Sequence, residues 1–390
     1  MRATIKDQTA IAGIGATEFS KKSGKSDLQL AAEAVKAALD DCGLTPRDVD
    51  GMTTFSLDFS DEIQVAQAVG IPQLKLFSRI PHGGGAATSL LHQAAMAVAT
   101  GMCDVVVCYR GMNGRSGRRM GEGVGLNVIS GDRIHWGWYM PHGLVTPASW
   151  VAMYTRPYME EFGLTSEDLG RVAVTVRQYA VNNPKAFFFG KPLTLAEHQQ
   201  SRWIVEPLRL YDCCQETDGG CAVVVTTPER ARDLRQPPVL MRAVAQGSAS
   251  DQEVMTSFYR PHLDRFPEMA LVAKQIYDQS GLGPNDIDAA VLYDAFTPEI
   301  FFQLEEYGFC KRGESKDFVR AGNLEINGRL PTNTNGGMLS EAYIHGVNGI
   351  HEGVRLIRGT SVNQPKKNID HVLVTSAPGV PLSAAILGKA

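Results

Sequence analysis

The sequence predicts an α/β fold in which two similar halves follow one another in a single chain, because two long stretches repeat the same order of elements. Residues 28–56 read LQLAAEAVKAALDDCGLTPRDVDGMTTFS, and residues 267–296 read PEMALVAKQIYDQSGLGPNDIDAAVLYDAF. Each stretch has the apolar spacing of an amphipathic helix, which we expect to end at Gly43 or Gly281. In both, a Pro-x-Asp-aliphatic-Asp turn and a strand follow the helix.

A second shared unit comes after each of these stretches. A glycine cluster, a helix and an apolar strand are expected over residues 83–108 and again over residues 336–375, where the helix is expected to continue to about Ile357. Each half then ends in another short apolar strand, over 221–226 and 383–387. Equivalent segments lie roughly 240–250 residues apart, which indicates duplication of a whole α/β domain instead of a short-period repeat array.

The repeat divides the chain into a first half, residues 1–235, and a second half, residues 236–390. The first half carries a large insertion, about 111–207, which is rich in Gly, Arg, Trp and Tyr and lacks the strand-helix rhythm. Irregular segments of this length usually serve an active site, so we expect the insertion to cover one. A role in dimerisation or packing is the alternative.

Composition restricts the class of protein. The chain has 390 residues, of which 44% are hydrophobic and 21% charged, and a formal net charge of −4. These values are typical of soluble globular proteins and do not favour nucleic-acid binding. No apolar run is long enough to span a bilayer, and the N-terminus lacks a signal-peptide pattern. Seven cysteines without a disulfide spacing favour the cytoplasm, and the absence of paired CxxC or HExxH motifs argues against a metal site.

Three motifs resemble segments of the thiolase superfamily, and especially of its lipid-transfer type. They are AIAGIGATEF at residues 10–19, YDCCQETDGGCAVVV at residues 211–225 and NTNGGMLSEAYIHG at residues 333–346. They occur in the family's order around the repeat, and the resemblance extends over essentially the whole chain. It implies a thiolase fold with a five-layer α-β-α-β-α core.

The catalytic positions of a thiolase are replaced in this sequence. Where the resemblance places the nucleophilic cysteine, residues 82–85 read His-Gly-Gly-Gly, and where it places the second cysteine, residues 375–379 read Thr-Ser-Ala-Pro-Gly. Tyr343 occupies the position of the histidine in the family's Gly-His-Pro segment, and Tyr293 begins a Tyr-Asp-Ala-Phe segment in place of Asn-Glu-x-Phe or His-Asp-x-Phe. Cysteine-based acyl transfer needs a thiol beside a base, so this chemistry is not expected.

A pair of tyrosines therefore stands where a thiolase holds the substrate thioester. A phenol can donate a hydrogen bond to an enolate, and if its pKa is lowered from about 10 it can also exchange a proton. This chemistry suits retro-aldol cleavage of a β-hydroxyacyl-CoA without a covalent intermediate. We expect Tyr343 to take the hydroxyl proton and Tyr293 to protonate the enolate carbon.

The tyrosine pattern is similar to that of the steroid side-chain-cleaving aldolases of the lipid-transfer-protein group. This resemblance implies cleavage of a 17-hydroxy-3-oxo-pregnene-20-carboxyl-CoA to an androstenedione-like 17-ketosteroid and propionyl-CoA. It implies no cofactor, since coenzyme A is part of the substrate. It also implies an acyl-CoA-associated partner subunit with an OB-fold. We expect that partner to bind a homodimer core, because thiolase-like halves leave a sheet edge that usually pairs with a second copy. A degenerate thiolase that uses another residue for acyl transfer, and a non-catalytic subunit that binds acyl-CoA or lipid, are the alternatives.

Further candidates for substrate or CoA binding each have a structural alternative. Glycine permits close backbone approach to a ligand, but it also permits tight helix packing. His82 could contact the thioester or pack in its loop, and His345 could orient a tyrosine or face solvent. The arginines could hold the CoA phosphates or lie on a solvated loop. These candidates are His82, Gly83, Gly84, Asp294, Gly336, Gly337, His345, Arg115 and Arg118.

Overall fold

The computed structural model describes residues 5–57, 59–81, 83–117, 119, 134–377 and 379–390. Within these residues, nine strands form one mixed sheet in the order β3-β2-β4-β7-β1-β8-β11-β10-β9, and β5 and β6 pair separately. The strands are β1 Ala10–Ala16, β2 Gly51–Phe55, β3 Leu76–Ile80, β4 Val105–Asn113, β5 Trp203–Val205, β6 Leu208–Arg209, β7 Asp218–Thr226, β8 Val239–Gly247, β9 Ala289–Val291, β10 His371–Ser376 and β11 Leu382–Lys389.

The sheet shows the duplication directly. The first half contributes the order β2-β4-β7-β1, and the second contributes the matching order β9-β10-β11-β8. Within these matching sets of four strands, one pair is parallel, β2 with β4 and β9 with β10, and the remaining pairs are antiparallel. The edge strand β3 adds a further parallel pair with β2 in the first half. Only two residue pairs between β1 and β8, Ala10 with Leu240 and Ile11 with Val239, join the two halves of the sheet. The predicted twofold repeat is confirmed, whereas the boundary at residue 235 stays a prediction.

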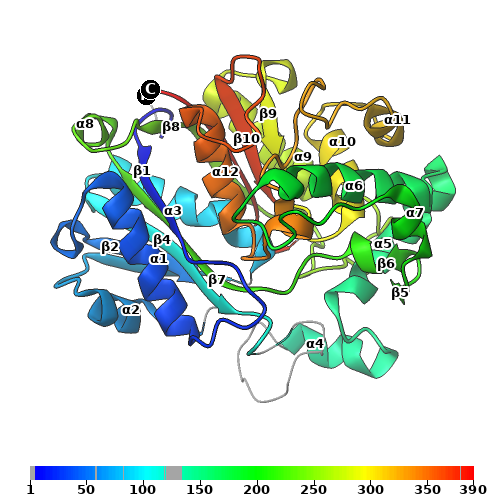
Figure 1. Ribbon diagram of the computed structural model, residues 1–390, viewed down its shortest axis with the longest axis horizontal. Helices are drawn as coiled ribbons and strands as arrows, with labels where there is room; N and C mark the ends of the chain where they lie inside the picture. Colours follow the sequence, from blue (N-terminus) through cyan, green and yellow to red (C-terminus); the bar gives the residue numbers. More distant parts are fainter. Residues whose placement is uncertain (1–4, 58, 82, 118, 120–133, 378) are drawn as a thin grey trace.

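Helices complete the five predicted layers (Figure 1). On the outer side of the first half-sheet, α1 packs against β1, β4 and β7, and α2 packs against α1. On the outer side of the second, α9 packs against β8 and β11. Between them, α3 and α12 contact strands of both halves and each other. These helices are α1 Asp27–Cys42, α2 Glu62–Val69, α3 Ala87–Ala99, α9 Pro267–Ser280 and α12 Val347–Arg358.

The packing of the central helix α3 depends on its small side chains. The central helix α3 reads ATSLLHQAAMAVA, and four of its five alanines are buried, all but Ala99 at its C-terminal end. Small side chains let the helix approach strands of both halves of the sheet, so its N-terminal end is held close to residues of both halves. Thr88 shows this directly, because its hydroxyl donates to Ser383 of β11 at 2.8 Å.

The insertion is more regular than the sequence indicated. It contains α4 Ile134–Tyr139, α5 Pro147–Phe162, α6 Ser166–Asn182 and α7 Leu195–Gln200, besides β5 and β6. The expectation of a segment without regular elements is therefore wrong. Local signals explain the helices, since Thr165 and Asp168 form a capping box at the start of α6 and Gly163 ends α5 in the left-handed conformation. The helix α6 then packs on α10 Thr297–Glu306 and α11 Ser315–Arg320 of the second half.

The helix expected from Gly337 to about Ile357 is broken, which corrects the sequence analysis. A π-helical turn spans Gly337–Glu341, the chain then extends, and α12 begins at Val347. Left-handed backbone at His345 (φ +49°) and Gly346 (φ +85°) prevents a continuous helix. Tyr343 therefore lies in the extended segment between the two helical elements, not on a helix.

No helix among the described residues is both long enough and apolar enough to cross a membrane.

Candidate active site

The two predicted tyrosines meet. Tyr293 lies two residues beyond the end of β9, and Tyr343 lies in the extended segment between the π-helical turn and α12. Their hydroxyl oxygens are 3.3 Å apart, a distance at which either group can donate a hydrogen bond to the other. Tyr293 is buried and Tyr343 is partly exposed. The pair therefore lies at a boundary between the core and a space that a ligand can enter.

The backbone of both tyrosines is fixed by side chains from other elements. The N–H of Tyr293 donates to Thr375 Oγ1 at 3.0 Å and to Gln303 Oε1 at 3.1 Å, while the Gln303 amide donates to the Tyr293 carbonyl at 2.7 Å. The N–H of Tyr343 donates to Thr217 Oγ1 at 2.9 Å. Because these partners are buried or partly buried, the phenol rings are held by a rigid frame.

Gly84 makes room for the phenol of Tyr293. A Cβ atom built on Gly84 would overlap the Tyr293 hydroxyl. Gly84 stands in the turn that precedes α3, which is the segment where the resemblance to thiolases places the nucleophilic cysteine. Because Gly84 has no side chain, it leaves space for the hydroxyl oxygen of Tyr293, which belongs to the second half.

The pKa values of the tyrosines correct one expectation. Burial raises the pKa of Tyr293 well above its usual value, and the neighbouring Tyr343 raises it further. Burial likewise raises the pKa of Tyr343, with Cys214 as the next contribution. The lowered pKa that would ease proton exchange is not found, because both phenols are removed from water without a nearby cation strong enough to compensate. Both tyrosines are therefore neutral hydrogen-bond donors at neutral pH.

His345 packs against Tyr343 on the buried side of the tyrosine pair. Its side chain is buried, its Nδ1 accepts a hydrogen bond from Arg110 Nε at 3.2 Å, and its ring meets the Tyr343 ring edge-on at 4.9 Å. A Cβ atom on Gly83 would come within 2.9 Å of His345 Nε2. Burial, followed by the charge of Arg110, lowers the pKa of His345 well below its usual value, so the imidazole is neutral. The alternative that His345 faces solvent is thus wrong.

Asp294, Gly336 and Gly337 support the turn that carries Tyr343. Asp294 Oδ1 accepts from the N–H of Met338 at 2.7 Å, and a Cβ atom on Gly337 would overlap the carboxyl group. Burial raises the pKa of Asp294 to about 7. Gly336 lies against Ala180 of α6, where a Cβ atom would come within 2.7 Å of the alanine methyl. These contacts place all three behind the tyrosines, and their contact with substrate stays a prediction.

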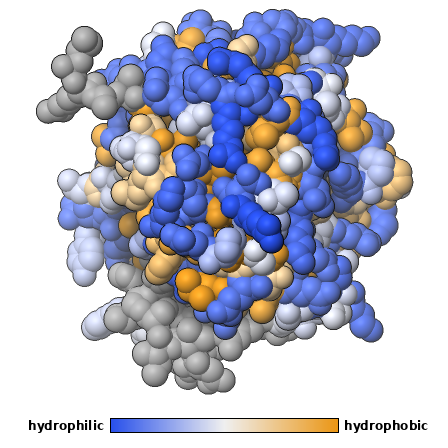
Figure 2. Space-filling view, turned by 90° about the vertical axis from the view of Figure 1, so that its left-hand side faces the viewer, coloured by the Kyte–Doolittle hydropathy of each residue, from blue (hydrophilic) through white to orange (hydrophobic). Residues whose placement is uncertain are grey.

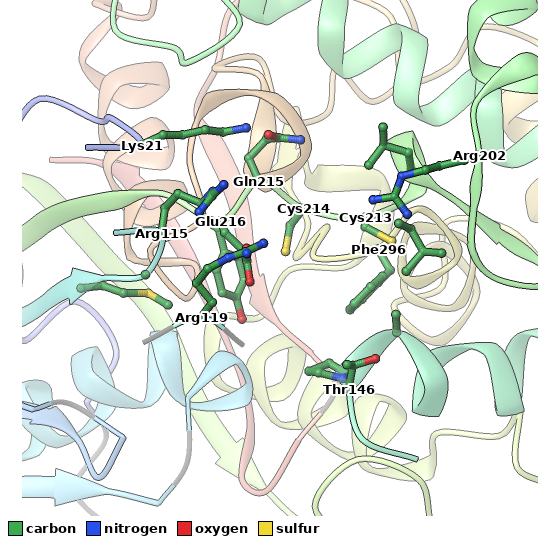
Figure 3. A pocket seen from close by; sticks show the side chains of 17 residues that line it. Lys21, Arg115, Arg119, Thr146, Arg202, Cys213, Cys214, Gln215, Glu216 and Phe296 are labelled. Carbon is green, nitrogen blue, oxygen red and sulfur yellow. The ribbon is translucent and has the colours of Figure 1, made fainter. Parts of the chain in front are cut away.

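A pocket of about 340 Å³ leads to Tyr343 (Figure 3). Its volume is in the range of small-molecule sites. The insertion supplies a large share of its wall, which agrees with a segment that covers an active site, although the same insertion also packs on the second half. The lining residues are Lys21, Met112, Gly114, Arg115, Arg119, Thr146, Pro147, Ala148, Arg202, Ile204, Leu210, Cys213, Cys214, Gln215, Glu216, Phe296 and Tyr343.

Four cationic side chains line this pocket. Figure 3 shows Lys21, Arg115 and Arg119 on one side and Arg202 on the other. Arg119 pairs with Glu216 at 2.9 Å. Arg115 was predicted, whereas Lys21 and Arg202 were missed, because they belong to segments distant in the sequence and carry no motif. His82 and Arg118 lie outside the described residues, so nothing places them in or out of the site.

The cysteines do not offer a thiolase-like nucleophile. All seven are free, and burial is the main cause that raises the pKa of each. Cys213 and Cys214 do line the pocket, but their thiols are protonated at neutral pH and hence weak nucleophiles. In the described part of the chain, no group of three or more His, Cys, Asp and Glu side chains is placed to hold a metal ion.

Comparison with known proteins agrees with this geometry. The family model "Thiolase, N-terminal domain" matches residues 9–229, and "Thiolase C-terminal domain-like" matches residues 247–388. The chain is 62% identical to a steroid side-chain-cleaving aldolase of Thermomonospora curvata, over 97% of each chain. It is 58% identical to a 17-hydroxy-3-oxo-4-pregnene-20-carboxyl-CoA lyase of Mycobacterium tuberculosis, over 98% of this chain and 100% of the other.

Solved structures show the same fold. An Ltp2-ChsH2(DUF35) aldolase superposes with a TM-score of 0.95 at 60% identity and 99% coverage of both chains. Human mitochondrial 3-ketoacyl-CoA thiolase superposes with a TM-score of 0.69 at 15% identity, over the full length of both chains, which shows a shared fold alone. The chain therefore belongs to the thiolase family and, within it, to the group that contains the aldolase of Thermomonospora curvata.

Proposed function

We propose that this protein is a carbon–carbon lyase that cleaves a β-hydroxyacyl-CoA by a retro-aldol reaction. The observation that carries the proposal is the pair of phenol oxygens 3.3 Å apart at the end of a pocket whose thiols are protonated. The names of the two relatives above support a 17-hydroxy-3-oxo-pregnene-20-carboxyl-CoA as the substrate and a steroid side chain as the part removed. The products would be an androstenedione-like 17-ketosteroid and propionyl-CoA.

The raised pKa values of the tyrosines suggest how the protons move. Tyr343 receives the proton of the β-hydroxyl group while it passes its own phenolic proton to Tyr293. The bond between the α- and β-carbons breaks, its electron pair enters the thioester enolate, and the hydroxyl oxygen becomes the ketone oxygen. Tyr293 gives its original proton to the α-carbon. Each tyrosine ends as a neutral phenol, so no free phenolate is required in the buried site.

The cations at the pocket support binding of the CoA part of the substrate. Arg115 and Arg202 line opposite sides of the pocket, and Lys21 lies beside Arg115 (Figure 3). Phosphate groups pair well with arginine and lysine side chains. The apolar lining residues Ile204, Leu210 and Phe296 provide contacts suited to a bulky hydrocarbon. Arg118 remains a candidate for the same phosphates.

The assembly that we propose is a homodimer bound to a second type of subunit. The strand β3 lies at one edge of the sheet, and Phe77 on β3 and Ile63 on the adjacent α2 are 57% and 46% exposed. Figure 2 shows the side of the molecule that carries α2, where apolar side chains reach the surface among hydrophilic ones. Exposed strand edges are normally covered, and pairing of two β3 strands would cover this one.

The partner subunit is supported by a solved relative whose name joins Ltp2 with ChsH2(DUF35). We propose that the partner is the OB-fold, acyl-CoA-associated subunit implied by the sequence resemblance. Free cysteines throughout the chain support a cytoplasmic location.

The test is conversion of the synthetic 17-hydroxy-3-oxo-pregnene-20-carboxyl-CoA, with both products followed by mass spectrometry. The protein is assayed alone and after co-expression with the OB-fold subunit. Stoichiometric 17-ketosteroid and propionyl-CoA support the lyase. Acyl transfer to free CoA, with a thioester-linked enzyme intermediate, supports the degenerate thiolase instead. Binding of the substrate without turnover under both conditions supports a non-catalytic subunit.

A further inference from the structure

A buried arginine contacts a buried histidine beside the tyrosine pair. Arg110 belongs to β4 of the first half, and His345 precedes α12 of the second. Their side chains are among the least exposed polar groups of the protein, at 2% and 1%. An arginine with an almost inaccessible side chain is rare, and it usually has a specific partner. Its Nε atom donates to His345 Nδ1 at 3.2 Å.

This hydrogen bond determines which nitrogen of His345 carries the proton. A guanidinium group has only donors, so Nδ1 must act as the acceptor through its lone pair. In a neutral imidazole the single proton then lies on Nε2. Burial and the positive charge of Arg110 both lower the pKa of His345, so the doubly protonated ring is disfavoured. His345 thus presents one N–H donor, at Nε2.

The Nε2 atom points toward the reacting end of the site. It faces Gly83, where an added Cβ atom would come within 2.9 Å, and the next residue, Gly84, lies against the Tyr293 hydroxyl. The Tyr343 ring borders the same imidazole at 4.9 Å. Among the described residues, none accepts a hydrogen bond from His345 Nε2. The donor is therefore available next to the glycine turn against which the Tyr293 hydroxyl lies.

We infer that Arg110 is a positioning residue that keeps His345 as a neutral Nε2–H donor, and that this donor binds the thioester oxygen of the substrate as it becomes an enolate oxygen. The inference rests on the lyase function proposed above. A neutral imidazole stabilises the developing negative charge by a hydrogen bond without delivering a proton to the oxygen, which would divert it from the α-carbon. The left-handed backbone of His345 (φ +49°) is sparsely populated for a non-glycine residue, as expected where geometry is held for function.

The protonation and tautomeric state of His345 can be measured by NMR in the protein without substrate. Histidine labelled with nitrogen-15 gives distinct NMR signals for the two neutral tautomers and the protonated ring, and the His345 signal is identified by its loss in His345→Gln. We expect the Nε2–H tautomer across neutral pH in the wild type, and its loss or mixing in Arg110→Met. Arg358→Met removes another buried arginine, one that binds Asp41 away from the tyrosines, and should leave the tautomer unchanged. A protonated His345, or an Nδ1–H tautomer in the wild type, overturns the inference.

Kinetics test the role of the donor. His345→Leu removes the N–H, and turnover should fall by about a hundred- to a thousandfold with little change in KM, as for loss of an oxyanion donor. His345→Gln retains a side-chain N–H and should keep more turnover than His345→Leu. Arg110→Met should lower kcat without a matching rise in KM. Near-normal turnover of His345→Leu would overturn the donor role.

If Arg110→Met does not fold, the tautomer of His345 measured in the wild-type protein still tests the inference. Since the tautomer is measured without substrate, its outcome is independent of whether the proposed steroid is the substrate.

Discussion

Gly84 and Tyr293 come from different halves of the molecule, and the phenol of Tyr293 occupies the space that a side chain at position 84 would need. This relationship links the loss of the thiolase nucleophile to the gain of a phenol. The resemblance places the thiolase nucleophile on the turn before α3, and here the hydroxyl of Tyr293, from the loop after β9, fills the space beside that turn.

Replacing Gly84 by alanine should displace the Tyr293 hydroxyl from Tyr343. Because the added methyl would overlap the phenol oxygen, the hydrogen bond of 3.3 Å should break, and turnover should fall at least tenfold. Gly137→Ala is the matched control, since a Cβ atom there meets no other atom within 4 Å. Steady-state kinetics and thermal unfolding of both variants check this. Unchanged turnover of Gly84→Ala would show that the phenol position is not critical.

Removing either phenol oxygen should nearly abolish cleavage while leaving the fold intact. Tyr343→Phe and Tyr293→Phe keep the rings, and each should lower turnover by about a hundred- to ten-thousandfold. Their combination should cost much less than the product of the two effects, since both act in one proton relay. Melting temperatures should change little. Tyr259→Phe, at an 82% exposed position, serves as the control. If both single variants retain near-normal turnover, the tyrosines are structural.

The thiols in the pocket should be dispensable. Cys213→Ala and Cys214→Ala should each cleave substrate at close to the wild-type rate, because protonated thiols do not form an acyl-enzyme. Iodoacetamide should react slowly for the same reason, which peptide mass spectrometry measures, and cleavage should stay largely intact. Rapid loss of activity on modification of one cysteine, with acyl-CoA as a protectant and an inactive alanine variant at that position, would revive the thiolase mechanism.

Asp294 should make the protein less stable as pH rises toward neutrality. Its pKa in the folded protein is about 7 against a usual 3.8, so the folded state binds the proton more tightly than the unfolded state. The stability that this proton provides is present below pH 3.8 and is lost as the pH rises through about 7. Asp294→Asn should therefore gain stability relative to the wild type between pH 5 and about pH 8, by up to a few kcal/mol in urea unfolding. Asp278→Asn, at an exposed position, is the matched control.

A charge at the β3 edge should weaken the proposed dimer. Phe77→Glu places a carboxylate on the exposed strand, and the molar mass in solution at micromolar protein should fall toward that of one chain. Light scattering after size-exclusion chromatography measures the mass. Val362→Glu changes another exposed apolar residue and should leave the mass unaltered. A monomeric wild type would contradict the homodimer itself.

The repeat could be predicted because its signals are local, and the tyrosine pair because the resemblance to thiolases places both residues at substrate-facing positions. Gly43 and Gly281 end two similar helices in left-handed C-caps, as their positions in the sequence indicated. The break before α12 could not be foreseen, since it depends on a left-handed histidine, and His345 carries no local signal for that conformation. The partner of Arg110 was also beyond reach, because that arginine stands within an apolar strand and its histidine lies 235 residues further on.

Only two residue pairs connect strands β1 and β8, yet residues from both halves of the sheet meet around the tyrosines. Both proton-carrying phenols belong to the second copy of the duplicated unit, and the first copy contributes bare glycine backbone and a guanidinium. The two copies of the duplicated unit thus have different roles. The second copy carries the acid–base groups, and the first copy supplies the residues that surround and position them. Neither copy holds a complete site, and the activity is a property of the fused pair.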